Sequence, residues 1–294
     1  MTHKHILETA ASTLLDPLAR QQLQGLHWLE LCCNEREPDQ YPVVTMGSGP
    51  PVLLLHGFDS SLLEFRRLVP LLKNHNTLII PDLFGFGFCP RPEKAPYGPE
   101  AVLEHLAEVL DTIPNNEPLG LIGASMGGSV AMELARRHPH RIDRLLLLAP
   151  AGLDGKPMPL PPVLDSLGVW FLGRSGVRRG LCRQAFADPD SNVGDPELEI
   201  ASLHLKVPGW ARSLAAFARS GGFAGCGAPL PHQSLHVLWG KKDRILRAPQ
   251  LRSAQLLLGD KLELVDDCGH LPHLDHPELV AQRWLAAECS HDCT

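Results

Sequence analysis

Short runs of apolar residues alternate along this chain with longer segments in which apolar residues recur every three or four positions. The runs predict buried strands and the longer segments predict amphipathic helices. We expect strands at residues 29–33, 43–46, 52–55, 77–80, 119–122, 145–148, 235–239 and 262–265, and helices at 62–72, 100–112, 126–137, 249–258 and 277–287. Strands that are apolar throughout and separated by helices indicate the α/β class, with a mostly parallel, doubly wound sheet.

The alternation of strands and helices stops after Gly152 and resumes near residue 228. The intervening segment is rich in proline and glycine, and we interpret it as a mostly helical cap. The predicted organisation is therefore a main domain of residues 1–152 and 228–294 with a cap of residues 153–227 inserted into it.

Four aromatic residues are candidates for lining a pocket that takes a long apolar chain: Phe84, Trp170, Phe171 and Phe223. An apolar patch on the cap could also contact a membrane peripherally. The alternative for each aromatic residue is ordinary packing, in the core for Phe84 and between the cap and the main domain for the others.

Charge and cysteine content narrow the classes of partner. The chain has 294 residues, a formal net charge of −6 and no cluster of lysine or arginine, which argues against a nucleic-acid partner. The polar N-terminus and the lack of a run of ~18 apolar residues predict a cytoplasmic protein without a membrane span. The eight cysteines include no C-x-x-C pair, so we expect reduced thiols. Cys289 to Cys293 could bind a soft metal, but a frayed terminus is the simpler interpretation, and we expect neither metal nor cofactor.

The segment Gly123-Ala124-Ser125-Met126-Gly127 matches the pattern G-x-S-x-G where an expected strand ends and an expected helix begins. Glycines at these places allow a tight turn that lifts the Ser125 hydroxyl out of the sheet. The hydroxyl then lies at a helix N-terminus, whose dipole favours developing negative charge. A serine here could instead cap the helix, but the strand-to-helix context favours a nucleophile.

A serine nucleophile needs a base to take its proton and a carboxylate to orient that base. His270 follows a glycine just after the last expected strand and is the candidate base, with His273 and His276 as alternatives. Asp243, beyond the strand at 235–239, is the candidate acid, and Asp154 after the preceding strand is the alternative.

Two backbone N–H groups are needed to bind the oxyanion that forms during acyl transfer. Met126 follows the nucleophile and is expected to supply one, and Phe58 in His56-Gly57-Phe58 the other. The side chain of His56 is expected to brace the loop by hydrogen bonds. Asp82, which ends another strand, is expected to hold the loop that follows it.

These motifs occur in the order and spacing of the α/β-hydrolase family, which the chain resembles from about Leu29 to Ala287. A narrower resemblance is to chlorophyll dephytylase and its cyanobacterial relatives. It rests on His56 to Ser61 with Leu63 to Arg66, on Ser220 to Phe223, and on Cys268 to His273. This resemblance implies hydrolysis of an apolar ester such as the phytyl ester of chlorophyll, at the surface of a thylakoid membrane.

Three other functions stay open from the sequence alone. The same residues on the same fold hydrolyse C–C bonds of dienone substrates, for which Arg174, Arg178, Arg179 and Arg183 could bind a carboxylate. A general carboxylesterase or lipase uses the same chemistry on other esters. A protein of this fold can also be a non-catalytic receptor, although such proteins usually lack one of the three residues that are present here.

Overall fold

The computed structural model describes residues 2–32, 37–114 and 118–289. Cys33 and the end of the chain from residue 290, where we considered a metal site, lie outside them. A single sheet of eight strands forms the centre of the described chain, in the order β1-β2-β4-β3-β5-β6-β7-β8. Neighbours from β4 to β8 pair in parallel, whereas β1 and β2 are antiparallel additions at one edge. The predicted α/β fold with a mostly parallel sheet is confirmed.

The strand bounds are close to the predicted apolar runs. The strands are β1 (Leu26–Leu31), β2 (Asp39–Gly47), β3 (Pro51–Leu55), β4 (Thr77–Pro81), β5 (Leu119–Ala124), β6 (Ile142–Leu148), β7 (Ser234–Gly240) and β8 (Leu262–Val265). Successive side chains of β3 point to opposite faces, so Leu53 belongs to one buried cluster and Leu54 to the other. Both faces of the sheet are therefore covered, which explains why these strands are apolar throughout.

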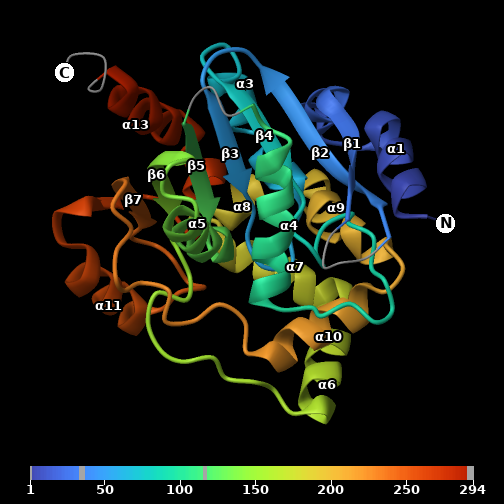
Figure 1. Ribbon diagram of the computed structural model, residues 1–294. Helices are drawn as coiled ribbons and strands as arrows, with labels where there is room; N and C mark the ends of the chain where they lie inside the picture. The colour runs from blue at the N-terminus through green and yellow to red at the C-terminus, as the bar shows by residue number, and fades with distance from the viewer. Residues whose placement is uncertain (1, 33–36, 115–117, 290–294) are drawn as a thin grey trace.

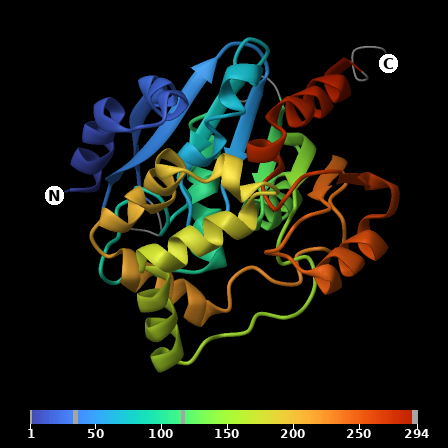
Figure 2. The same ribbon diagram turned by 180° about the vertical axis from the view of Figure 1, so that it is seen from behind.

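Two layers of helices cover the sheet (Figures 1 and 2). One face packs against α4 (Pro99–Asp111), α5 (Met126–Arg137) and α11 (Ala248–Leu258). The other face packs against α1 (His3–Thr13), α2 (Pro17–Gln22), α3 (Val69–Leu72) and α13 (Pro277–Cys289). Close approach on this second face requires Gly120, where a Cβ atom would lie 2.2 Å from the Trp284 ring.

One local expectation needs correction. The predicted helix at 62–72 is instead a 3₁₀ turn, η2 (Leu62–Phe65), followed by the short α3. Pro70, which lacks an N–H group, lies in the first turn of α3, so the regular helix restarts there. The N-terminal segment, for which no element was predicted, forms α1, whose Ile6, Leu7 and Ala10 are buried.

The segment between β6 and β7 contains α6 (Pro162–Leu172), α7 (Ser175–Ala185), α8 (Pro189–Asn192), α9 (Asp195–Leu203) and α10 (Trp210–Ser220). We call residues 153–227 the cap. Figure 1 shows α6 and α10 beyond the ends of the parallel strands, with α6 farthest from the sheet. Among the described helices, none is long and apolar enough to cross a bilayer.

Candidate active site

A strained turn between β5 and α5 presents Ser125. Its backbone has φ 51° and ψ −117°, a conformation that costs a non-glycine residue ~1–3 kcal/mol. The turn is so tight that a Cβ atom at Gly123 would lie 2.4 Å from the carbonyl oxygen of Gly127. A Cβ atom at Gly127 would lie 2.0 Å from the carbonyl oxygen of Leu55. The two glycines thus permit the close backbone contacts that hold the serine above the sheet.

Ser125, His270 and Asp243 form one hydrogen-bonded line. Nε2 of His270 lies 2.9 Å from Oγ of Ser125, and Nδ1 of His270 lies 2.8 Å from Oδ2 of Asp243. The second oxygen of Asp243 accepts hydrogen bonds from the backbone N–H groups of Ile245 and Leu246 at 2.8 and 2.9 Å. The carboxylate is therefore fixed in place, and it orients the imidazole toward the serine.

The alternative residues lie elsewhere. His273 is fully buried, with Nε2 3.3 Å from Oε1 of Glu64, and Nε2 of His276 lies 3.0 Å from the carbonyl oxygen of Asp267. Asp154 is exposed on the loop after β6. The structure therefore brings His270 and Asp243, but none of these three, to Ser125.

The loop after β3 runs beside the serine, where Phe58 was expected to supply an oxyanion N–H. A Cβ atom on Gly57 would lie 3.4 Å from Cβ of Ser125. Met126 is the first residue of α5, and N–H groups in the first turn of a helix have no partner within it. Phe58 therefore belongs to a loop that lies against Ser125, and Met126 directly follows Ser125 in the chain.

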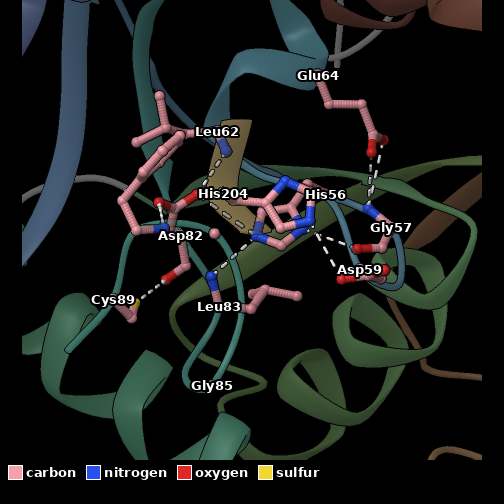
Figure 3. Close-up of polar contacts among 12 residues, drawn as sticks. His56, Gly57, Asp59, Leu62, Glu64, Asp82, Leu83, Gly85, Cys89 and His204 are labelled. Atoms are coloured by element: carbon pink, nitrogen blue, oxygen red, sulfur yellow. Dashed lines mark hydrogen bonds and ion pairs between the residues drawn. The ribbon is translucent and has the colours of Figure 1, made fainter. Parts of the chain in front are cut away.

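Buried side chains brace this loop (Figure 3). Nδ1 of His56 lies 2.8 Å from the carbonyl oxygen of Gly57, and Nε2 accepts the Leu83 N–H at 3.0 Å. Burial lowers the pKa of His56 to about 4, so its ring is neutral and Nδ1 is the donor to Gly57. The carboxylate of Glu64 accepts the Gly57 N–H at 3.2 and 3.3 Å. The bracing role predicted for His56 is confirmed.

Asp82 connects the loop after β3 with the loop after β4 by hydrogen bonds, and so holds the loop that follows it, as predicted. Its carboxylate oxygens accept the backbone N–H groups of Leu62 at 2.5 Å and Phe88 at 2.6 Å. The side chain is fully buried, and Figure 3 shows it on the side of His56 away from Glu64. Asp82 therefore acts on the position of the loops around His56 and is not part of the line of reacting groups.

Asp59 joins the loop to the cap. It follows Phe58 with φ 49°, and Trp210 Nε1 donates to its Oδ1 at 2.8 Å. His204 Nε2 lies 3.1 Å from the same oxygen, and Arg178 Nη2 lies 2.7 Å from Oδ2. Burial raises the pKa of Asp59, but these three partners outweigh it and hold that pKa below its ordinary value. Because all three belong to the cap, we call this group the Asp59 latch.

A pocket of about 250 Å³ opens at Ser125 and His270 between the cap and the main domain. Most of its wall is apolar, with Phe58 from the loop after β3 and the side chains of Leu172, Leu181, Ala185, Phe186, Ile200, Ala201, Ile245, Leu271 and Leu274. Among the charged residues that also line it, Arg178 pairs with Asp59 and Glu197 with Arg66. The space beside the nucleophile therefore suits an uncharged, apolar group.

The four aromatic residues proposed for the pocket do not line it. Phe84 is 1% exposed. It lies in the loop after β4 and packs on Tyr97 and on His105 of α4 in the core. Trp170 and Phe171 project from α6 into solvent, 60% and 54% exposed. Phe223 packs against Phe217. The apolar wall comes instead from Phe58, Phe186 and aliphatic residues of the cap and of the segments that follow β7 and β8.

Sequence reasoning also missed the buried charges. Asp59 and Glu64 lie within motifs that were used for the resemblance, but no role was assigned to either. A buried charge with a partner some 120 to 150 positions away, as in Asp59–Arg178 or Asp59–His204, leaves no local pattern. The one feature of the sequence that could have indicated a role for Asp59 is its place directly after Phe58, the expected oxyanion residue. Among the described residues no cluster of three or more potential ligands could hold a metal ion.

Comparison with known proteins agrees with this architecture. Residues 52–283 match the model of the alpha/beta hydrolase family. The chain is 31% identical over 244 residues to a 2-hydroxymuconate semialdehyde hydrolase of Pseudomonas sp. strain CF600, covering 78% of this chain and 83% of that protein. It is also 31% identical over 250 residues to the alpha/beta hydrolase domain-containing protein VTE7 of Arabidopsis thaliana, covering 82% and 74%.

Among solved structures, a thermophilic esterase from Thermogutta terrifontis superposes with a TM-score of 0.70 at 25% identity, covering 89% of this chain and 98% of the esterase. The family match spans Ser125, Asp243 and His270. The chain therefore belongs to the alpha/beta hydrolase family.

Proposed function

We propose that this chain is a serine hydrolase that cleaves a carboxylic ester with an apolar alcohol or acyl group. The observation that carries the proposal is the line Ser125–His270–Asp243, whose hydroxyl end faces a pocket with apolar walls. A serine, a base and an orienting acid in this arrangement are the parts that acyl transfer requires.

The reaction would proceed in two halves. Oγ of Ser125 attacks the ester carbonyl while Nε2 of His270 takes its proton, and the oxyanion binds the N–H groups of Phe58 and Met126. The C–O bond to the alcohol then breaks as His270 returns the proton to the leaving oxygen. Water, deprotonated by His270, attacks the acyl-enzyme and releases the acid and the free Ser125 hydroxyl.

The size and lining of the pocket support this substrate class. A volume of about 250 Å³ lies just below the ~300–1,000 Å³ that is typical of ligand pockets. It takes one apolar chain and leaves a bulky partner group outside. The phytyl ester of chlorophyll has this division between a chain and a large ring, and it is the substrate that the sequence resemblance implies.

Hydrolysis of C–C bonds is the second candidate, because one relative at 31% identity is a 2-hydroxymuconate semialdehyde hydrolase. Such a substrate carries a carboxylate. Of the four arginines considered for it, Arg178 lines the pocket, and Asp59 already neutralises its charge at 2.7 Å. Arg179 and Arg183 pair with Asp195 and Asp190 on the surface. A carboxylate would have to displace Asp59, so the ester is favoured.

Turnover of p-nitrophenyl butyrate by wild type and Ser125→Ala tests the proposal. The variant should fold normally and lose roughly 10⁶-fold in kcat. Ser12→Ala removes an exposed serine hydroxyl of α1 and should keep full activity. Normal turnover by Ser125→Ala would refute the proposal, and failure of the wild type to react with a fluorophosphonate probe would favour a non-catalytic receptor.

Substrate class is tested separately, with chlorophyll, other lipid esters and a dienone carboxylate offered side by side to the active enzyme. Release of phytol supports the finer proposal. Turnover of other esters alone would indicate a general carboxylesterase or lipase. Preference for the dienone would replace the ester with the second candidate.

A further inference from the structure

The cap helix α6 leaves an apolar stripe in solvent. Leu164, Leu167 and Phe171 are spaced by three and four residues, so they share one face of the helix. Their exposed fractions are 54%, 57% and 54%, and Trp170 beside them is 60% exposed. The chain leading into the helix adds Met158 and Leu160, which are also exposed. Single exposed apolar residues are ordinary, but six of them on one helix and the segment leading into it mark an interaction surface.

The opposite face of α6 is anchored. Asp165 and Val169 are 1% and 4% exposed, and Asp165 pairs with Arg219 of α10. The face of α6 with Asp165 and Val169 packs against α10, and the stripe lies on the face that does not. Figures 1 and 2 show α6 at the extremity of the described part of the molecule.

Basic residues lie beside the stripe, in a chain of net charge −6. Lys156 precedes α6 and Arg174 follows it, whereas Arg178, Arg179 and Arg183 farther along pair with acidic residues. The one acid of α6, Asp165, is buried and paired. A groove between α6 and α10 is lined by Trp170, Trp210 and three arginines, Arg174, Arg212 and Arg219. Its volume is about 650 Å³. The apolar surface and the cationic groove thus lie side by side on one face of the cap.

We propose that this face docks on an anionic lipid bilayer, with the α6 stripe in the interfacial layer and a lipid phosphate in the arginine-lined groove. Helices that lie in the plane of a membrane surface combine leucine and aromatic residues on one side with basic residues beside them. Tryptophan is favoured at the level of the headgroups, and cations near the surface are attracted to anionic lipid.

Charge decides between a bilayer and a second copy of the chain as the occupant. If the stripes of two molecules met, Arg174 and Lys156 of one would approach the same residues of the other. Like charges facing each other in an apolar contact are unfavourable. An anionic bilayer instead satisfies both the apolar and the cationic part of the surface.

The docking surface also connects with the pocket. Phe171 ends the stripe, and the next residue, Leu172, lines the pocket at Ser125. A docked cap would place the pocket within reach of a substrate dissolved in the bilayer. This last step rests on the proposed function, whereas docking itself does not depend on hydrolysis.

Cosedimentation with vesicles tests the proposal. Wild type should bind vesicles of phosphatidylcholine mixed with phosphatidylglycerol, and bind phosphatidylcholine alone more weakly. Leu164→Glu combined with Leu167→Glu should weaken binding more than ~10-fold, because two side chains can no longer enter the interface. Leu256→Glu, at a leucine 90% exposed on α11, is the matched control and should bind like wild type. Arg174→Glu should reduce the preference for the anionic vesicles.

Two further readouts separate docking from catalysis. Trp170 is the most exposed tryptophan of the chain, so its fluorescence should shift to the blue on vesicles, and Trp170→Phe should remove that shift. Ser125→Ala should bind vesicles normally, and Leu164→Glu with Leu167→Glu should hydrolyse a water-soluble ester normally. Absence of vesicle binding, equal weakening by Leu256→Glu, or a solution dimer abolished by the α6 variants would overturn the proposal.

Discussion

Replacing Asp59 by alanine should loosen the cap from the main domain and lower both stability and activity. The carboxylate holds Arg178, His204 and Trp210, and it directly follows Phe58, the residue expected to bind the oxyanion. Without it the cap loses its anchor to the loop after β3, and the Phe58 N–H is no longer held in one place. Stability and catalysis should therefore fall together.

The size of the effect follows from burial. The side chains of Asp59 and Arg178 are 6% and 9% exposed, and removal of one partner from a buried pair typically costs ~3–5 kcal/mol. Trp210→Phe removes one donor and keeps the aromatic ring, so it should cost only ~1–2 kcal/mol. Losing an oxyanion donor outright costs ~10²–10³ in kcat, so Asp59→Ala should lower kcat by up to ~10²-fold.

Urea unfolding and ester kinetics measure these effects, with a double-mutant cycle of Asp59→Ala and Arg178→Met isolating the pair. The coupling energy should exceed 1 kcal/mol. The Arg137–Glu100 pair is the control, because its side chains are 41% and 64% exposed and such pairs contribute ~0–1 kcal/mol. A coupling energy for Asp59 and Arg178 no larger than that of the control, with unchanged kcat, would refute the reasoning.

Two other predictions concern the acid and a buried histidine. Asp243→Asn should lower kcat for a p-nitrophenyl ester by ~10⁴-fold, since the amide no longer fixes the imidazole tautomer. Asp154→Asn should leave the kinetics with the same ester unchanged. The opposite pattern would show that Asp154 is the acid. Burial lowers the pKa of His105 to about 3, so the unfolded chain takes up its proton first as pH falls below the ordinary value near 6.5. This residue should make the free energy of unfolding ~2 kcal/mol smaller at pH 5 than at pH 7. His105→Phe should remove that part of the difference in urea titrations, and an unaltered pH dependence would show that His105 is not its source.

The main features of the fold are predictable because they leave local patterns. Continuous apolar runs indicate strands covered on both faces, and the structure has a strand at each predicted run. The prediction failed where tertiary contacts override a local pattern. The apolar spacing at 62–72 resembles a helix, but Asp82 fixes the backbone of Leu62 and Pro70 restarts the helix.

In the candidate site, too, some features could be predicted from the sequence and others could not. Ser125, Asp243 and His270 each follow a strand of a parallel sheet, so topology alone places them at one edge. The pocket wall could not be predicted in this way. Whether Trp170 faces the pocket or solvent depends on which side of α6 meets α10, and Phe84 is as apolar in the core as it would be in a pocket.

The N–H of His270 donates to the carbonyl oxygen of Ala185 at 2.7 Å, so the last turn of α7 supports the loop of the candidate base. The cap is consequently not an interchangeable module. A chimera that receives residues 153–227 from a relative would acquire new pocket walls and also new support for its imidazole. Such a chimera would keep its turnover only if the donor segment places a backbone carbonyl group where it can accept the N–H of His270.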